Sequence, residues 1–282
     1  MPLNHLETWI GRQEVRRDIC DANRFVRLAA TLDHEAPPWH AGLLPPLGHW
    51  LYFLDAAPMP RLGADGHAAR GGFLPPVPLP RRMWAASRLE FVEPLRVGDT
   101  VTRRSQITDV QLKEGQSGTL VFVKLLHEIF APSGDVALRE AQDLVYRGDA
   151  APDAPAGVPK PAPPGAEWRR ALTADPVLLF RYSALTFNGH RIHYDRPYAT
   201  GVEGYPGLVV HGPLIATLLV DHLRRHLPQV SLRRFEFRAL RPLFDGAPFE
   251  LCGRRSTDGG SVHLWARDAG GALCMDAIAT LA

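Results

Sequence analysis

The chain repeats a set of short sequence patterns, in the same order, in its first and second halves. The paired segments are 25–33 with 180–188, 42–55 with 207–221, and 88–91 with 234–237. The last pair, Arg-Leu-Glu-Phe and Arg-Phe-Glu-Phe, is followed in both halves by a proline and then by a Gly-Asp or Asp-Gly turn. Three matches in one order indicate a duplicated structural unit, which restricts the fold to two copies of one small architecture.

The two copies are separated by residues 149–166, which consist mainly of Ala, Pro, Gly and Asp. This composition is typical of a stiff, extended linker and unfavourable for a helix or a strand. We therefore expect a first half at residues 1–148 and a second half at residues 167–282, each of ordinary domain size.

Each half is predicted to contain one long apolar helix followed by antiparallel strands. Residues 213–225 are apolar on almost every face until Asp221, which predicts a buried helix, and a corresponding apolar helix is predicted from Gly48 to Ala57. The β-rich segments, separated by glycine-bearing turns, are 101–110, 119–127, 249–254 and 262–267. The prediction is an α+β fold with two curved antiparallel sheets, each wrapped around a central helix. Because each half alone would expose a strand edge, we expect the sheets to join edge to edge, with both helices on the concave side.

Composition excludes several classes of protein. The 32 basic residues (Lys and Arg) nearly balance the 30 acidic residues (Asp and Glu), so the charge gives no reason to expect a nucleic-acid partner. No apolar run is long enough to cross a membrane, and the N-terminal stretch lacks the apolar core of a secretory signal. The three scattered cysteines are too few for a disulfide framework, so we expect free thiols in a reducing compartment, the cytoplasm.

The stretch from Phe180 to Pro213 gathers three histidines, His190, His193 and His211, around one Gly- and Pro-rich connection. Imidazole is the side chain best suited to move protons near neutral pH. A helix that starts at Gly212-Pro213 would direct free backbone N–H groups towards the histidines. A proton-transfer residue beside an oxyanion-binding helix start is what chemistry on a carbonyl or thioester requires.

This stretch resembles the MaoC-like superfamily of R-specific enoyl-CoA hydratases, through the segments FRYSALTFNGHRIHYDRPYA and GYPGLVVHGPL. Within that superfamily it is most similar to the double-hotdog branch, which includes 3-methylfumaryl-CoA (mesaconyl-CoA type) hydratases and 3-hydroxyacyl thioester dehydratases. The resemblance implies a double hotdog fold. It also implies syn addition of water across a 2-enoyl thioester, or the reverse reaction, without a metal or redox cofactor.

The family motif Asp-x-Asn-Pro-x-His falls on residues 188–193, but Asn188 stands in place of the catalytic Asp and His190 in place of the motif Asn. An amide is no base at neutral pH, although it can hold a water or a substrate oxygen. The resemblance therefore implies that His193 is the general base and that Asn188 positions the water. The backbone N–H of Gly212 would polarise the thioester carbonyl.

Further residues are expected to bind substrate. His190, His211 and Tyr182 are predicted to line the pocket; the alternatives are a structural histidine for His190, a loop cap for His211 and a core aromatic for Tyr182. Arg233 and Arg234 could meet the coenzyme A phosphates, with a solvated strand edge as the alternative. The first half lacks paired histidines, so we expect it to be a structural half that widens the acyl tunnel.

Other functions remain open at this point. A thioesterase of the same fold usually carries a carboxylate on its central helix, but the first carboxylate here is Asp221, more than two turns in. A non-catalytic acyl-CoA-binding protein is conceivable because the first half has no evident site. A metalloenzyme could use His190, His193, His211 and Asp195, although their spacing is a weak metal signature, and we expect no metal. The favoured reading is a homodimeric hydratase acting on a short branched or dicarboxylic acyl-CoA.

Overall fold

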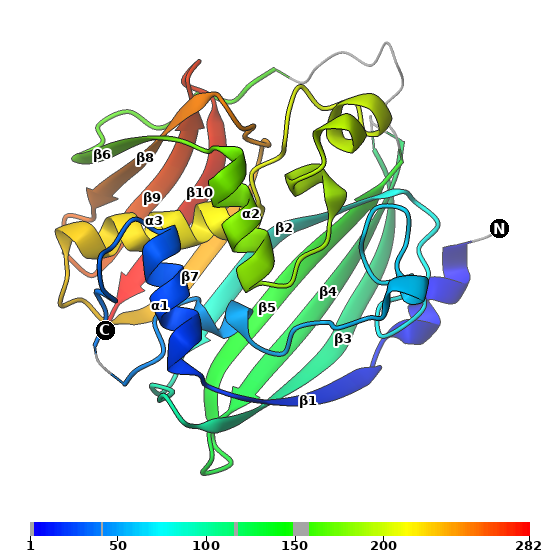
Figure 1. Cartoon of the computed structure of the whole chain (residues 1–282), viewed down its shortest axis with the longest axis horizontal. Helices are drawn as coiled ribbons and strands as arrows, with labels where there is room; N and C mark the ends of the chain where they lie inside the picture. Colours follow the sequence, from blue (N-terminus) through cyan, green and yellow to red (C-terminus); the bar gives the residue numbers. More distant parts are fainter. Residues whose placement is uncertain (1–2, 41, 116–117, 149–157) are drawn as a thin grey trace.

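The computed structural model describes residues 3–40, 42–115, 118–148 and 158–282. Within them, ten strands form one continuous antiparallel sheet in the order β1-β3-β4-β5-β2-β7-β10-β9-β8-β6 (Figure 1). The strands of the first half are β1 (Gln13–Ile19), β2 (Arg81–Phe91), β3 (Thr100–Gly115), β4 (Gly118–Phe130) and β5 (Val136–Arg147). Those of the second half are β6 (Trp168–Thr173), β7 (Leu232–Ala239), β8 (Pro248–Arg255), β9 (Ser261–Asp268) and β10 (Leu273–Leu281). The four strand segments predicted from the sequence are therefore confirmed.

The strand order shows the duplication directly. Read outward from the centre, the first half runs β2-β5-β4-β3-β1 and the second half runs β7-β10-β9-β8-β6, so each strand has its counterpart at the same rank. The two halves meet where β2 pairs antiparallel with β7, from Ala86 opposite Arg238 to Glu90 opposite Arg234. This pairing satisfies the strand edge that either half would expose by itself, and it confirms the expected continuous sheet.

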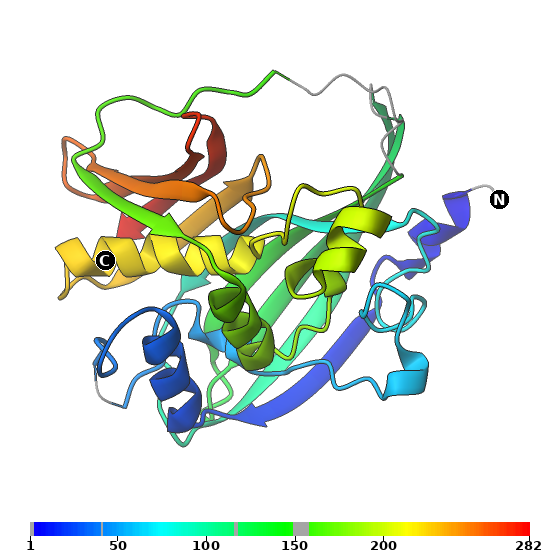
Figure 2. The same cartoon turned by 45° about the horizontal axis from the view of Figure 1, so that its top comes forward.

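Three α-helices lie on one side of this sheet (Figure 2): α1 (Ala22–Thr31), α2 (Pro176–Leu185) and α3 (Gly212–His226). α1 and α2 occupy equivalent places in the two halves and contact each other. Both begin at an aspartate cap: Asp21 accepts from the Asn23 N–H, and Asp175 accepts from the Leu178 N–H. α3 is buried on all sides from Leu214 to Leu223 and packs on β8, β9 and β10, so the buried helix predicted at 213–225 is present.

The central helix predicted for the first half, from Gly48 to Ala57, is wrong. Only one 3₁₀ turn forms there, η2 (Gly48–Leu51), and Tyr52 is already extended. The reason is a tertiary contact: the Phe53 N–H donates to the Asp18 carboxylate at 2.8 Å, so it is not available to a helix. Phe53 also has a positive φ of 57°, which interrupts a right-handed helix. Of the two predicted helices, only the one in the second half therefore forms.

The other short helices are η1 (Leu3–Trp9), η3 (Met59–Arg61), η4 (Arg191–His193) and the π-helical η5 (Tyr198–Val202). Cys20, Cys252 and Cys274 are buried free thiols, as expected. Within the described ranges, no helix is long and apolar enough to cross a membrane. The predicted linker at 149–166 is described only from residue 158 on, where Pro161 forms a bridge with Ala272.

Candidate active site

A cavity of about 1770 Å³ is lined by residues of both halves. The second half lines it with the histidine loop (residues 186–194) and the start of α3. The first half lines it with β2 and with much of the long loop (residues 58–80) that precedes this strand. The cavity therefore contains most of the predicted site residues, namely Tyr182, Asn188, His190, His193, His211 and Gly212.

His193 lies on η4 and is 7% exposed. Its Nδ1 donates to the backbone oxygen of Val209 at 2.7 Å, because a carbonyl can only accept. The lone pair of the neutral ring is therefore on Nε2. Burial lowers the pKa of His193 to about 4. At neutral pH this side chain is an uncharged proton acceptor, as the proposed base requires.

Asn188 orders the histidine loop. Its Oδ1 accepts from the His190 N–H at 3.0 Å, and its own N–H donates to the Ser183 oxygen at the end of α2. The preceding Phe187 has a positive φ of 49°, so the chain turns sharply after α2. Since Oδ1 is engaged, the amide NH₂ of Asn188 is the group left to bind a water or a substrate oxygen.

His211 stacks on His193, with ring centroids 3.7 Å apart and planes 19° from parallel. Its Nε2 shares a hydrogen bond of 2.8 Å with the Ser183 hydroxyl. Its Nδ1 is buried and has no hydrogen-bond partner among the described residues. Burial, followed by the neighbouring histidine charges, holds the pKa of His211 well below its usual value. Tyr182 meets this ring edge-on at 5.1 Å and forms part of the pocket wall, as predicted.

Gly212 is the first residue of α3 and lines the cavity. Pro213 follows it and has no N–H, so the amides at this helix start are those of Gly212 and Leu214. A Cβ at Gly212 would meet no atom closer than the Trp84 oxygen at 3.9 Å. The protein itself therefore does not require glycine here, and the open space beside the amide is available to a ligand oxygen.

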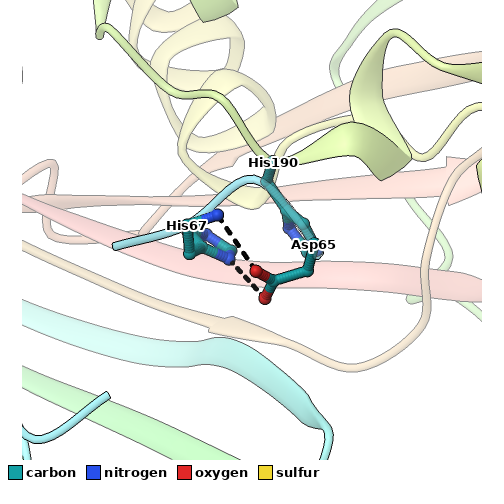
Figure 3. Close-up of side chains that lie close together, drawn as sticks. All are labelled: Asp65, His67 and His190. Carbon is teal, nitrogen blue, oxygen red and sulfur yellow. Dashed lines mark hydrogen bonds and ion pairs between the residues drawn. The ribbon is translucent and has the colours of Figure 1, made fainter. Parts of the chain in front are cut away.

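The first half contributes two residues that the sequence analysis missed, Asp65 and His67 of the long loop. Nδ1 of His67 lies 3.0 Å from Oδ2 of Asp65, and the His67 backbone N–H donates to Oδ1 at 3.0 Å (Figure 3). The ring of His67 lies 4.1 Å from that of His190, which in turn meets His193 edge-on at 5.4 Å. An extended row of imidazoles, His67-His190-His193-His211, thus runs along the cavity.

Backbone contacts fix this approach of the two loops. The backbone N–H of Arg191 donates to the backbone carbonyl oxygen of Asp65 at 2.9 Å. Gly66 has φ +86°, and a Cβ there would lie 1.9 Å from the Gly189 carbonyl oxygen, so only glycine fits. The sole sequence signal was the tripeptide Asp-Gly-His within a Gly- and Pro-rich stretch, and nothing local indicates that it faces His190.

The metal set considered from the sequence is not brought together, because the Asp195 carboxylate pairs with Arg191 at 2.8 Å. Among the described residues, a different group, Asp65, His67 and His190, has donor atoms within 4.8 Å of one another. Both oxygens of Asp65 already accept hydrogen bonds from His67, which makes this a hydrogen-bonded pair beside a third ring. Arg233 and Arg234 are exposed on β7 and do not line the cavity.

Comparison with known proteins places these features in a class. Residues 47–245 match the hydroxyacyl-thioester dehydratase type 2 family, and the chain belongs to this family. It is 46% identical, over 97% of its length and 96% of the relative's, to the mesaconyl-C(4)-CoA hydratase of Chloroflexus aurantiacus. It is 30% identical, over 74% of its length and 77% of the relative's, to the mitochondrial hydroxyacyl-thioester dehydratase type 2 of Schizosaccharomyces pombe.

Solved structures agree at the level of the fold. A MaoC-like dehydratase from Phytophthora capsici superposes with a TM-score of 0.71 at 14% identity, covering 100% of this chain and 98% of that one. A second MaoC-like dehydratase gives a TM-score of 0.69 at 15% identity, covering 98% and 99%. The resemblance inferred from the histidine motif is thereby confirmed.

Proposed function

We propose that this chain is a hydro-lyase that adds water reversibly across the double bond of a 2-enoyl-CoA thioester. One observation carries the proposal beyond family membership: the unprotonated Nε2 of His193 and the open amide of Gly212 line the same cavity. The first is suited to take a proton from water, and the second to bind the thioester oxygen as it gains negative charge.

In the hydration direction, the thioester oxygen would bind the Gly212 N–H at the positive end of α3. The NH₂ of Asn188 would hold the water, and Nε2 of His193 would accept its proton as the water oxygen bonds to the β-carbon. The α-carbon is then protonated on the same face. None of these steps uses a metal or a redox cofactor, and coenzyme A enters only as part of the substrate.

A short branched or dicarboxylic acyl group is the proposed substrate, in line with the named activity of the Chloroflexus relative. Trp50 and Trp84, with ring centroids 5.0 Å apart, give the cavity an apolar wall for the acyl carbons. Arg82 lines the same cavity, where within the described residues its guanidinium is hydrogen-bonded to the Tyr146 hydroxyl and paired with no carboxylate. It is the group we assign to a second substrate carboxylate.

Contact of Arg233 and Arg234 with the coenzyme A phosphates stays a prediction, and Arg234 has Glu90 at 3.7 Å as a competing partner. A homodimer in the cytoplasm is likewise our proposal. The buried free thiols fit a reducing compartment.

A thioesterase is the less favoured function. Its expected helix carboxylate, Asp221, is 5% exposed and does not line the cavity. It is held by His34 at 2.6 Å, Arg170 at 3.0 Å and Arg225 at 2.8 Å, so it is unavailable as a nucleophile or base.

The test is an absorbance assay of double-bond loss with mesaconyl-C4-CoA and crotonyl-CoA, with and without a chelator, alongside a thiol-release assay. We expect hydration without thiol release, unaffected by the chelator. His193→Ala should lower the rate by at least about a hundredfold in protein that circular dichroism shows to be folded, because it removes proton transfer. Thiol release, or near wild-type hydration by folded His193→Ala, would refute the assignment.

A further inference from the structure

The cavity holds a second histidine whose chemistry differs from that of His193. Asp65 accepts hydrogen bonds from both the backbone and the ring of His67. Burial alone would raise the pKa of Asp65, but the hydrogen bonds from His67 and the charges of His67 and His190 outweigh it and hold the pKa low. Asp65 is therefore an ionised carboxylate behind an imidazole, with Nδ1–H of that ring fixed towards it and Nε2 left for other partners.

The proposed reaction requires two proton transfers, one from water and one to the α-carbon. His193 and His211 have no carboxylate partner among the described residues, and Asn188 stands where the family motif has an Asp. In the row of four imidazoles, a proton on one ring disfavours a proton on the next, because like charges repel. The Asp65 carboxylate makes His67 the ring of this row that is best able to carry positive charge.

We propose that His67, oriented by Asp65, is the second acid/base residue of this site and protonates the α-carbon, so that each half of the chain supplies one catalytic imidazole. This proposal rests on the proposed function. The sequence suggested that the first half is purely structural; under this proposal it also supplies a catalytic residue.

In the hydration direction, an O–H bond of water breaks, its proton passes to Nε2 of His193, and the oxygen bonds to the β-carbon. The π electrons move to the thioester oxygen at Gly212, and the enolate then takes the proton from Nε2 of protonated His67, whose electron pair stays on the ring. His193 ends protonated and His67 neutral; before the next turnover, His193 releases its proton to solvent water and His67 takes one up from solvent.

Several charged groups act on His67. Burial is the largest effect and, with the charges of Arg82 and Arg70, holds the pKa of His67 below its usual value, although the hydrogen bond and the charge of Asp65 raise it. The pKa of His190, on the facing loop, is itself lowered, first by burial and then by the charge of His67. Because the acid must be protonated, the rate should fall as pH rises through the pKa of His67. Removing the Asp65 charge should move this limb to lower pH.

The experiment separates the two proton transfers in the full-length enzyme. The probe is the hydrated product that the wild-type enzyme makes from mesaconyl-C4-CoA, incubated in D₂O, with deuterium at the α-carbon followed by mass spectrometry. We expect His193→Ala to lose dehydration yet keep α-exchange, since His67 still removes that proton. His67→Gln should lose both by at least about a hundredfold.

Asp65→Asn is the second variant, because it is nearly isosteric and leaves the backbone contact of Asp65 with Arg191 in place. It should slow both reactions at least about tenfold at neutral pH and shift the pH limb downward. The matched control is Asp276→Asn, which alters another Asp–His pair, with His263 at 2.6 Å; neither residue of that pair lines the cavity. It should behave as wild type.

Retention of hydration and exchange by folded His67→Gln, with both lost in His193→Ala, would overturn the proposal and leave His193 as the single base. Loss of activity on chelation, restored by Zn²⁺, would also overturn the acid/base role of His67, since Asp65, His67 and His190 would then hold a metal ion. A wild-type enzyme that hydrates neither mesaconyl-C4-CoA nor crotonyl-CoA would instead refute the proposed function.

Discussion

Replacing Glu140 by Gln should destabilise the fold by about 3 kcal/mol at neutral pH and by much less in acid. Glu140, on β5, is 3% exposed. Its carboxylate lies 3.0 Å from His49 Nε2 and accepts from Trp50 Nε1 at 3.0 Å and from the Ser87 hydroxyl at 2.7 Å. These partners belong to η2 and β2, so the carboxylate ties the turn that replaces the missing helix to the strand at the seam between the halves.

The magnitude follows from the pKa of Glu140. Burial alone would raise this pKa, but the hydrogen bond and charge of His49, the charge of His127 and the Ser87 hydrogen bond lower it from 4.5 to about 2. At about 1.4 kcal/mol per pKa unit, this difference contributes about 3 kcal/mol to the free energy of unfolding. Because the folded pKa is the lower one, the contribution is fully present above the unfolded value and is lost as pH falls towards the folded value. By pH 3 about 2 kcal/mol of it should be gone.

The assay is urea unfolding of wild type and Glu140→Gln at pH 7 and at pH 3, followed by circular dichroism. The stability gap between the two proteins should narrow by about 2 kcal/mol, since all other carboxylates are common to both. Glu90→Gln is the control: its carboxylate is 39% exposed in a surface pair with Arg139, and it should change stability by less than about 1 kcal/mol at either pH. A gap that stays constant with pH would refute the ionised, hydrogen-bonded state assigned to Glu140.

Three further outcomes are expected. Asn188→Asp should retain part of the hydratase activity, because a carboxylate can still accept from the His190 N–H and can bind the water as an acceptor, whereas Asn188→Ala can do neither and should be much slower; equal rates of the two variants would show that this side chain does not hold the water. Calorimetry with a non-reactive coenzyme A thioester should give one site per chain, and two equivalent sites would contradict a single cavity shared by the halves. Residues 167–282 expressed alone should be insoluble or inactive, because β7 loses its partner β2 and the cavity loses His67; a soluble, fully active fragment would exclude both roles of the first half.

The sequence predicted those parts of the molecule whose signals are local or repeated. The helix at 213–225 could be found because its apolar residues leave no polar face. The duplicated order of segments agrees with the strand order that the two halves share. The histidine motif located His193, His190 and Asn188, and the Gly-Pro pair located the helix start beside them.

Two features could not be found in this way. The apolar residues at 50–54 have the composition of a helix, but a distant side chain, Asp18, takes the Phe53 amide, and tertiary contact overrides the local pattern. The approach of His67 to His190 depends on backbone packing between Gly66 and Gly189, residues 123 positions apart in the sequence. No periodicity or spacing within either segment encodes such a contact.

These two features are connected by the way the halves have diverged. With no central helix in the first half, the inner face of β3, β4 and β5 needs another cover. Val77, with Phe73, Leu74 and Leu79 beside it, packs the end of the long loop into the apolar cluster on those strands. The same loop, once anchored there, passes over the cavity and places Asp65 and His67 against the histidine loop of the second half. Replacing a helix by a loop thus accounts both for the large cavity at the seam and for the first half's residues within it.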